Sequence, residues 1–203
     1  MKAVIATSNQ GKLREFKSLF NDIAIEIEPQ SKFNVPDAVE DGLSFVENAL
    51  IKARHASRLT NLPSIADDSG LEVDYLKGAP GIYSSRFAGN NATDEENISK
   101  LLLALNGVPF AERIARYQCV IVKIDHPDDP TPIIAQGSWE GLIALEPKGH
   151  QGFGYDPIFY IPELKCMSAE LENNVKDKVS HRSQAMAVLM EKLYLTSSND
   201  LKN

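Results

Sequence analysis

Hydrophobic positions along the 203-residue chain recur with two periods, one of two residues that is typical of strands and one of 3.6 residues that is typical of helices. A short β-type run with Val4 and Ile5 predicts a strand over residues 2–6, and alternating apolar and acidic residues predict a second strand over 24–28. Between them, Leu13 and Phe16 recur at helical spacing after Lys12, which predicts a helix. The order of strand, polar loop, helix and strand is that of an α/β unit.

Two further helices are marked by a capping box, in which Ser or Thr precedes Glu by three residues. The pattern pairs Ser44 with Glu47 and Thr93 with Glu96. Each pair can satisfy backbone N–H groups that a helix start leaves open, so a helix is expected directly after each pair. The first of these helices is expected to end near residue 60.

The remaining β patterns predict a mixed sheet. Residues 64–66 form an apolar run that leads into the sequence Asp-Asp-Ser-Gly at 67–70, and residues 71–76 resemble a separate strand. Residues 67–70 by themselves are typical of a turn, because Asp, Ser and Gly are all turn formers. Two long β patterns over residues 113–125 and 132–145 indicate a hairpin. Helices mixed with strands and a hairpin predict an α/β protein with a mixed sheet.

The composition is that of a soluble globular protein, with 43% hydrophobic and 24% charged residues. The length fits one domain, or one core divided into two lobes. No run of about 18 apolar residues is present, and the N-terminus becomes polar too early for a signal peptide, so neither a membrane span nor export is expected. Cys119 and Cys166 cannot build a disulfide framework, which favours the cytoplasm.

The formal net charge of −7 argues against nucleic-acid binding, because such proteins usually carry a basic face and no run of Lys and Arg is present. An acidic protein can still bind a small anion if it supplies a metal ion, a few placed cations and backbone N–H groups. Four segments of the chain carry groups of this kind.

The first segment is the polar loop of Thr7, Ser8, Asn9, Gln10, Gly11 and Lys12. A loop between a strand and a helix offers free N–H groups and the positive end of the helix dipole, and Lys12 adds a full charge, which together suit a triphosphate. A P-loop requires Ser or Thr directly after its Gly-Lys pair, whereas Leu13 follows here, so this is not a Walker A motif. An ordinary helix-capping loop has a similar composition.

The second segment contains two adjacent carboxylates, Asp67 and Asp68, at the end of an apolar run. Burying both is costly unless a cation pairs with them, and a hard cation such as Mg²⁺ prefers oxygen ligands. Glu40, in an acidic loop, can supply a further carboxylate. Lys52 lies on or beside the apolar stripe of its predicted helix, from which it can either extend to solvent or reach a phosphate.

The third and fourth segments lie toward the C-terminus. Residues 152–157 combine two glycines, which allow a ligand to approach the backbone closely, with Phe153 and Tyr155, whose rings offer flat surfaces for a base. His181 and Arg182 are donors at a predicted helix start, where they suit carbonyl oxygens or phosphates. Taken alone, these segments are also typical of a turn with an aromatic anchor and of a polar first helical turn.

Together and in this order, the segments make the sequence closely resemble the inosine triphosphate pyrophosphatase family, also called the dITP/XTP pyrophosphatases. The resemblance covers nearly the whole chain. It is carried by the motifs ATSNQGKLREF, GLSFVENALIKARHA, IADDSGLEVDYLKGAPGIYSSRFAG, GSWEG, GFGYDPIF and SHR.

The resemblance implies a two-lobed α/β fold over residues 1–203, with an elongated mixed sheet and the active site in the cleft between the lobes. It implies a homodimer that hydrolyses the aberrant purine nucleotides ITP, dITP and XTP to the monophosphate and pyrophosphate. The implied cofactor is Mg²⁺, and Mn²⁺ accepts the same oxygen ligands. Neither nucleic acid nor a membrane is an expected partner.

The resemblance also assigns roles to individual residues. The metal-binding acids fall on Glu40 and Asp68, and Asp68 is in addition the general base. The substrate-binding residues fall on Thr7, Ser8, Asn9, Gln10, Gly11, Lys12, Ser69, Phe153, Gly154, Tyr155, Asp156, Lys176, His181 and Arg182, and the helix pattern adds Lys52. Ser8 stands where other members often carry glycine, which can shift the approach of the backbone to the phosphates.

Two other functions stay open at this point. A related pyrophosphatase of similar architecture could prefer pyrimidine triphosphates, although the segments around Phe153 and His181 speak against it. A nucleotide-binding sensor without catalysis is disfavoured, because Glu40 and Asp68 are both present. A panel of substrates with and without Mg²⁺ separates these functions.

Overall fold

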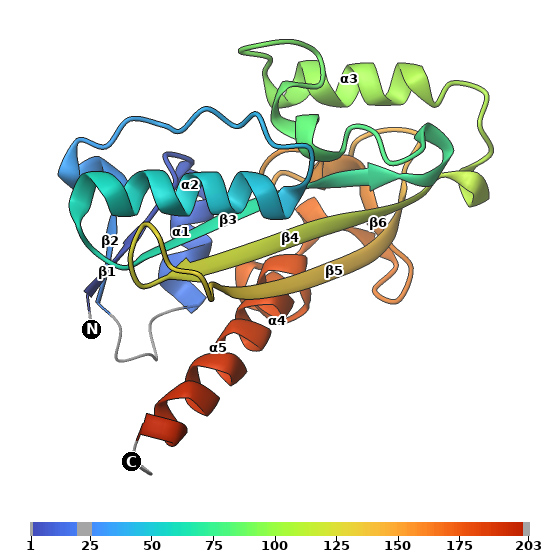
Figure 1. Ribbon diagram of the computed structural model, residues 1–203. Helices are drawn as coiled ribbons and strands as arrows, with labels where there is room; N and C mark the ends of the chain where they lie inside the picture. The colour runs from blue at the N-terminus through green and yellow to red at the C-terminus, as the bar shows by residue number, and fades with distance from the viewer. Residues whose placement is uncertain (1, 20–25, 201–203) are drawn as a thin grey trace. The chain divides into compact units, whose positions relative to one another are not determined.

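The computed structural model describes residues 2–19 and 26–200 (Figure 1). The chain forms two compact units. The first unit contains Met1–Asp68, Cys119–Gly137 and His181–Asn203. The second unit contains Ser69–Gln118 and Ser138–Ser180. Each unit is therefore built from segments that are distant in sequence.

The strands of the described residues form a mixed sheet in the order β2-β1-β3-β4-β5-β6-β7. Their bounds are β1 Lys2–Ile5, β2 Glu26–Pro29, β3 Ser64–Val73, β4 Ile114–Ile124, β5 Ile133–Ile143, β6 Phe159–Ile161 and β7 Cys166–Met167. β1 pairs in parallel with β2 and β3, whereas β6 pairs antiparallel with β5 and β7, so the predicted mixed α/β class is confirmed. β2 begins at Glu26, and residues 24 and 25 of the strand predicted over 24–28 lie outside the described residues.

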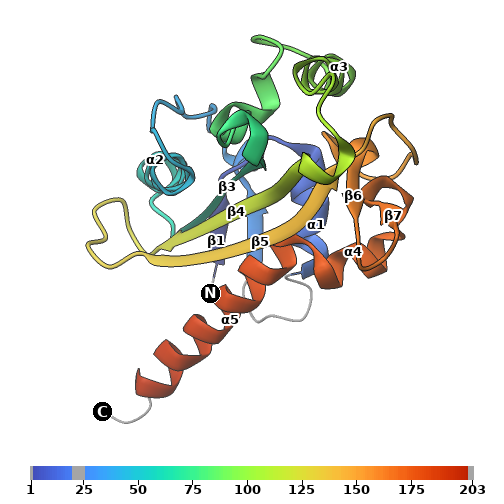
Figure 2. The same cartoon turned by 90° about the vertical axis from the view of Figure 1, so that its right-hand side faces the viewer.

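In the first unit, helices cover both faces of the sheet. Helix α2 (Phe45–Thr60) lies on one side of β1 and β3, and helices α1 (Gln10–Leu19) and α5 (His181–Asp200) lie on the other (Figure 2). Successive side chains of a strand point to opposite faces. The residues of β3 therefore alternate between two apolar clusters, with Ile65 on the side of α1 and α5 and Ala66 on the side of α2.

Both predicted helix starts are capped. Thr93 and Glu96 form the complete capping box, with the Thr93 hydroxyl accepting the Glu96 N–H and the Glu96 carboxylate accepting the Thr93 N–H. At α2 the Ser44 hydroxyl accepts the Glu47 N–H at 3.3 Å, but the Glu47 carboxylate accepts the N–H of Leu43 instead. The capping residues therefore fix where these helices begin, as the sequence predicts.

The second unit carries helices α3 (Asp94–Ala104) and α4 (Asn173–Val179) and a core with a cluster of aromatic rings. The centroid of the Phe159 ring lies 4.6 Å from that of Tyr117 and 5.4 Å from that of Trp139. Aromatic pairs at such distances add to the stabilisation from buried area. The two units thus have separate apolar cores of different composition.

Residues 67–70 belong to a strand, where their composition predicts a turn. β3 runs without a break over Ser64–Val73, so the separate strand predicted over 71–76 is wrong. Its last part, Asp74–Leu76, is a short 3₁₀ helix. Turn-forming residues can remain in a strand when the flanking residues are buried and each polar side chain finds a partner.

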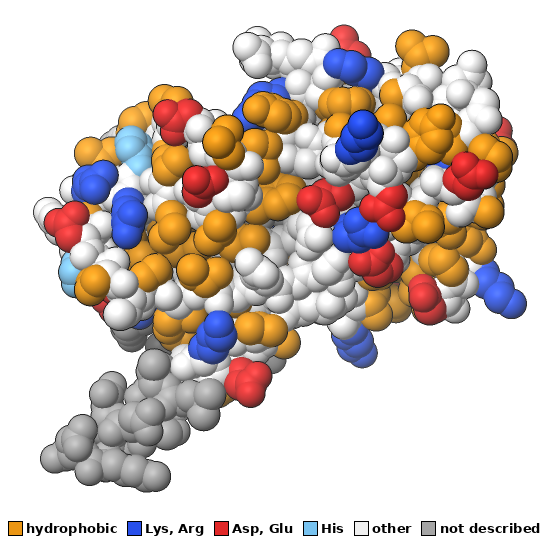
Figure 3. Space-filling model, turned by 45° about the vertical axis from the view of Figure 1, so that its right-hand side comes forward, with side chains coloured by type: hydrophobic (Ala, Val, Ile, Leu, Met, Phe, Trp, Pro, Cys, Tyr) orange, Lys and Arg blue, Asp and Glu red, His pale blue; other side chains and the backbone are white. Residues whose placement is uncertain are grey.

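Two observations concern the lengths of the helices and the charges on one face of the molecule. Within residues 2–19 and 26–200, every helix falls short of the length and apolar character that crossing a bilayer demands. Acidic and basic side chains are interspersed on the face shown in Figure 3. That described face therefore lacks the basic stripe on which nucleic-acid binding depends.

Replacing Ala53 by Leu is expected to destabilise the protein by about 1–3 kcal/mol, because Ala49, Ala53 and Ala56 are fully buried between α2 and the sheet. Arg58→Leu introduces the same residue at an exposed position of α2 and should change stability by less than about 0.5 kcal/mol. Urea unfolding measures both variants. Wild-type stability in Ala53→Leu would contradict this packing of α2.

Candidate active site

Two buried carboxylates are adjacent in β3. Asp67 is 1% exposed and Asp68 is 6% exposed. Because side chains alternate along a strand, the two carboxylates point to opposite faces of the sheet. Asp67 shares the face of Ile65 with α1 and α5, whereas Asp68 shares the face of Ala66 with α2. Each carboxylate therefore needs its own compensating cation.

Asp67 is compensated by Lys12 and Arg182. Its Oδ2 lies 2.9 Å from Lys12 Nζ and 3.5 Å from a guanidinium nitrogen of Arg182. Arg182 is 1% exposed, pairs also with Glu15 and lies over the Phe16 ring. Burial lowers the pKa of Arg182 to about 10, so the guanidinium stays charged near neutral pH. One buried arginine thus links the start of α5 to α1 and β3.

Asp68 is compensated by Lys52 of α2. Lys52 Nζ lies 3.0 Å from Asp68 Oδ1 and 3.4 Å from Glu40 Oε1. Burial by itself lowers the pKa of Lys52, but attraction by Asp68, Asp67 and Glu40 outweighs it, so the pKa lies above its usual value. The ammonium group is therefore charged. The structure thus places Lys52, which the sequence singled out separately, beside both Glu40 and Asp68, which were expected together.

The predicted phosphate loop joins β1 to α1 and is organised by its own side chains. Asn9 Oδ1 accepts the Lys12 N–H at 3.1 Å and caps the helix, and Thr7 Oγ1 accepts the Asn9 N–H at 3.2 Å. The N–H groups of Gln10 and Gly11 lie in the first turn, where a helix offers no internal acceptor. The loop therefore presents backbone donors at the positive end of the α1 dipole.

Ser8 of the same loop has a partner that the sequence did not suggest. Its hydroxyl donates to Asp37 Oδ2 at 2.9 Å, and its carbonyl accepts the Gln10 Nε2 group at 3.3 Å. The hydroxyl proton of Ser8 is therefore directed to a carboxylate, although the residue type suggested a donor to phosphate.

In the second unit, the Asp156 carboxylate organises the predicted base-recognition segment. Asp156 is 3% exposed, and its Oδ2 accepts Lys176 Nζ at 2.6 Å and the Phe153 N–H at 2.9 Å. Its Oδ1 accepts the Ser168 hydroxyl at 2.9 Å and the Tyr117 hydroxyl at 3.4 Å. Lys176 Nζ also lies 5.4 Å from the centroid of the Phe153 ring. Phe153, Asp156 and Lys176 therefore form one cluster.

Tyr155 is part of the core, which differs from the expectation that its ring is open to a base. It is 3% exposed, and its hydroxyl donates to the Ser84 carbonyl at 2.8 Å. Burial, with a further contribution from Asp94, raises the pKa of Tyr155, so this hydroxyl stays protonated. Gly154 donates its N–H to Asp94 Oδ2 at 2.7 Å, which fastens the segment to the start of α3.

Sequence patterns did not single out several partners in these groups. They are Glu15, Asp37, Asp94 and Ser168. Asp37 belongs to the same acidic loop as Glu40, and this proximity in sequence is a signal that points to it. The other three are polar residues in ordinary helical or loop contexts, and no local pattern distinguishes them.

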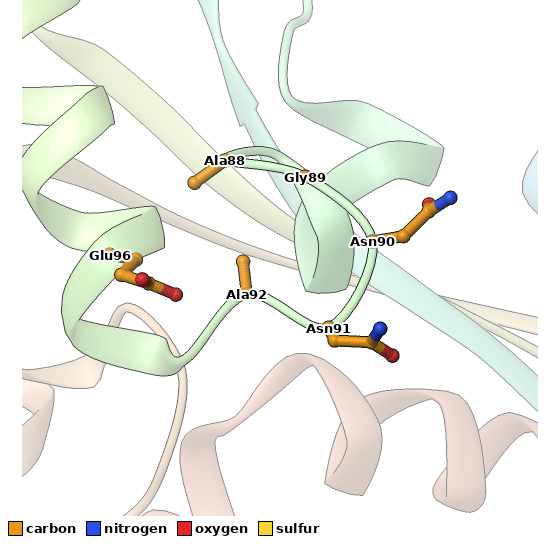
Figure 4. A pocket seen from close by; sticks show the side chains of 6 residues that line it. All are labelled: Ala88, Gly89, Asn90, Asn91, Ala92 and Glu96. Atoms are coloured by element: carbon orange, nitrogen blue, oxygen red, sulfur yellow. The ribbon is translucent and has the colours of Figure 1, made fainter.

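The other predicted residues adjoin these groups in the chain. Ser69 follows Asp68 in β3 and is half-buried, and His181 precedes Arg182 and is buried. A separate hollow of about 290 Å³ in the second unit is shown in Figure 4. Its lining residues are Ala88, Gly89, Asn90, Asn91, Ala92 and Glu96. Since no predicted site residue lines it, the hollow is not part of the candidate site.

Asp68 and Glu40 fit the oxygen ligands of a hard divalent cation. Asp68 Oδ1 is held by Lys52, whereas Asp68 Oδ2 is buried without a hydrogen-bond partner among the described residues. Such an open oxygen is costly unless a cation or water satisfies it. No group of three or more His, Cys, Asp or Glu side chains in the described residues is placed to hold a metal. Mg²⁺ needs only one or two carboxylates when phosphate oxygens and water complete its shell.

Backbone donors at a helix start, two partly buried lysines and a carboxylate with an open oxygen are the groups that metal-assisted chemistry on a phosphate requires. The fold and these groups define an α/β protein with a candidate phosphate site. The model of the Ham1 family matches residues 3–192, so the chain belongs to the Ham1 family.

Known relatives span the same length. A dITP/XTP pyrophosphatase of Vibrio parahaemolyticus is 57% identical, covering 95% of this chain and 96% of that protein. The structure of a HAM1 protein from Coxiella burnetii is 49% identical with a TM-score of 0.89, covering 96% of this chain and 98% of that one. The Staphylococcus aureus Ham1 protein is 42% identical with a TM-score of 0.84 and the same coverage of 96% and 98%. These relatives therefore share both sequence and fold with this chain.

Replacing Gly152 by Ala is expected to disrupt the Asp156 cluster. A Cβ atom at Gly152 would lie 2.0 Å from Asp156 Oδ2, and the φ of +80° is one that side chains rarely adopt. We expect the free energy of unfolding to fall by about 2–4 kcal/mol.

Gly154→Ala is the matched control for this prediction. Its φ of +62° is also positive, but a Cβ atom there meets nothing within 4 Å. The loss should therefore be limited to about 1–2 kcal/mol of backbone strain. Equal losses in the two variants, measured by urea unfolding, would contradict the close approach at Gly152.

Proposed function

We propose that this chain is a nucleoside triphosphate pyrophosphatase that hydrolyses the aberrant purine nucleotides ITP, dITP and XTP to the monophosphate and pyrophosphate. The observation that carries the proposal is the buried Asp68 carboxylate, with one oxygen on Lys52 and the other open among the described residues. Membership of the Ham1 family and the dITP/XTP pyrophosphatase of Vibrio parahaemolyticus support the choice of substrate.

Asp68 is the general base in this proposal. Its open oxygen accepts a proton from the water that attacks the α-phosphorus, while the bond from that phosphorus to the bridging oxygen breaks. Lys52 holds the other oxygen at 3.0 Å and so orients the carboxylate. Attack at the α-phosphorus releases pyrophosphate intact, which matches the proposed products.

Lys12, Lys52 and the N–H groups of the phosphate loop bind the part of the substrate that leaves. Negative charge gathers on the pyrophosphate as the bond breaks, and donors that are already in place stabilise that charge. Lys12 Nζ lies 2.9 Å from Asp67 in this structure, so a bound phosphate shares or replaces that carboxylate as its partner. Thr7 and Asn9 keep the loop in shape by their internal hydrogen bonds.

Glu40 and Asp68 would hold the metal ion, for which we infer Mg²⁺, with Mn²⁺ as a substitute that accepts the same oxygen ligands. A bound divalent cation supplies positive charge that neutralises phosphate oxygens and makes a water more acidic. Lys52 already neutralises part of the charge of both carboxylates, which keeps them close together before any metal binds.

Base recognition is assigned to the cluster around Phe153 and Lys176. Inosine and xanthosine present an acceptor at O6 and a donor at N1, whereas adenine presents the reverse. A site with donors toward O6 leaves buried groups unpaired when adenine enters, which can discriminate by about 10⁴-fold. His181 and Arg182 are further candidates for this role. Arg182 is held by Glu15 and Asp67 here, so its contact with a base stays a prediction.

Three further expectations belong to the proposal. The two units are the lobes of one domain, the protein forms a homodimer, and it acts on the nucleotide pool of the cytoplasm. Sedimentation equilibrium tests the homodimer directly, because a monomer mass over a wide concentration range would exclude it.

Pyrophosphate release should be fast from ITP, dITP and XTP in the presence of Mg²⁺, slow from ATP and GTP, and absent with EDTA. A panel that also contains UTP and dTTP measures the preference. The acceptor at O6 distinguishes these substrates from ATP, the 2-amino group of guanine distinguishes GTP from them, and the need for a cation beside Asp68 and Glu40 explains the loss with EDTA. Faster release from UTP or dTTP would mean that the substrate is a pyrimidine nucleotide. Nucleotide binding without any turnover would indicate a sensor.

Asp68→Asn should lower kcat by about 10²- to 10⁴-fold, because an amide cannot accept the proton of the attacking water. The amide oxygen of Asn can still accept from Lys52, which also keeps Glu40 as its partner, so the variant should remain folded. Asp125→Asn is the matched control, since Asp125 is an exposed carboxylate paired with Lys123 in the first unit. Steady-state kinetics with ITP decide the assignment, and near-normal turnover in Asp68→Asn would overturn it.

A further inference from the structure

One carboxylate connects two loops of the first unit that carry the candidate chemistry. Asp37 Oδ2 accepts the Ser8 hydroxyl at 2.9 Å, and Asp37 Oδ1 accepts Gln30 Nε2 at 2.6 Å. Ser8 belongs to the phosphate loop, and Asp37 belongs to the acidic loop over residues 34–44. Gln30 is buried and therefore gives the carboxylate a fixed support.

Both loops lead within a few residues to the charged groups on β3. In the phosphate loop, Ser8 is followed by the helix cap and by Lys12, which pairs with Asp67. In the acidic loop, Asp37 is followed by Glu40, which lies 3.4 Å from the ammonium group of Lys52. The Ser8–Asp37 hydrogen bond therefore connects the loop with the proposed phosphate donors to the loop with Glu40, which is proposed as a metal ligand.

The acidic loop is fastened to α2 on both sides of Glu40. Before it, the Pro36 carbonyl lies 2.9 Å from His55 Nε2. After it, the Gly42 N–H donates to Asn48 Oδ1 at 2.9 Å. Because the acidic loop is fixed to α2, its residue Asp37 can hold the phosphate loop in place. Both oxygens of that carboxylate accept hydrogen bonds, one from Ser8 and one from Gln30.

The charge of Asp37 opposes the proposed ligand. A carboxylate beside a phosphate loop repels a triphosphate, so simple electrostatics predicts that its removal strengthens phosphate binding. The hydroxyl proton of Ser8 points to Asp37 and is not offered to a phosphate. If the Ser8–Asp37 pair strengthens phosphate binding, it must therefore do so by holding the phosphate loop in the right position.

We infer that Asp37 is a positioning residue that, through Ser8 and Gln30, sets the phosphate loop relative to the loop of Glu40. The inference rests on the proposed function for the identity of the ligand.

The test compares Asp37→Ala, Asp37→Asn, Ser8→Ala and the double variant Ser8→Ala/Asp37→Ala with the wild type. Asp37→Asn removes the charge but can keep both hydrogen bonds, because its amide oxygen accepts from Ser8 and its amide nitrogen donates to a flipped Gln30. Asp41→Ala is the matched control, since Asp41 is exposed in the same loop and carries the same charge.

The probe is inorganic tripolyphosphate, titrated calorimetrically into each full-length variant in EDTA, so that neither metal nor turnover is needed. Asp37→Ala and Ser8→Ala should weaken binding about 3- to 10-fold, the effect of one lost hydrogen bond on a binding loop. The double variant should be no weaker than Asp37→Ala, because both changes remove the same link. Asp37→Asn and Asp41→Ala should each bind tripolyphosphate at least as tightly as the wild type, because each removes a negative charge and keeps the Ser8 link.

With ITP, Asp37→Ala should raise KM by a similar factor and change kcat less, whereas Asp68→Asn lowers kcat. Urea unfolding of each variant shows whether weaker binding comes from a lost positioning contact or from a loss of folded protein. If Asp37→Ala does not fold, Ser8→Ala provides the test.

Equal or tighter tripolyphosphate binding in Asp37→Ala would overturn the inference, as would additive losses in the double variant or a failure of the wild type to bind. Tripolyphosphate binding without hydrolysis of any nucleotide would instead remove the proposed function and leave this inference standing.

Discussion

The organisation of the first unit depends on the burial of two adjacent carboxylates in one strand. Two neighbouring negative charges inside a sheet would be prohibitively costly if they shared one environment. Alternation along β3 separates them, so that Asp67 faces α1 and α5 and Asp68 faces α2. Each face then supplies its own cation, Lys12 with Arg182 on one side and Lys52 on the other. The three helices of the unit are therefore tied to the same strand by charge as well as by apolar packing.

This division also gives the two aspartates different chemical capacities. Asp67 is 1% exposed and lies between Lys12 and Arg182, which suits a residue that holds the phosphate loop and the start of α5 in place. Asp68 is 6% exposed and shares its one lysine with a second carboxylate, that of Glu40. A carboxylate with an open oxygen beside a second carboxylate can bind a cation or accept a proton. The geometry therefore supports the choice of Asp68 over Asp67 that the family resemblance implies.

Local patterns predicted the helix starts at Ser44 and Thr93 because capping depends on residues only three positions apart. They failed at 67–70, where turn-forming residues stay in a strand because their partners come from distant helices. The same reason explains the missed partners: Ser8 and Asp37 are 29 residues apart, and Asp94 and Gly154 are 60 apart. The pairing of Glu15 with Arg182 spans 167 residues, which no periodicity can reveal. Sequence patterns therefore single out candidate residues for the chemistry, but they do not reveal the distant groups that hold those residues in place.

Asp156 in the second unit differs from Asp68 in how many hydrogen bonds its two oxygens accept. Asp156, like Asp68, is buried beside a lysine, yet its two oxygens accept four donors, from Lys176, Phe153, Ser168 and Tyr117. Burial, together with the neighbouring Asp156, raises the pKa of Tyr117, so that donor keeps its proton. Asp156 has no oxygen left for a new proton or cation without giving up an existing bond, and a Cβ at Gly152 would collide with it. Because both of its oxygens are occupied, Asp156 holds the segment around Phe153 in place, whereas Asp68 keeps one oxygen without a hydrogen bond among the described residues.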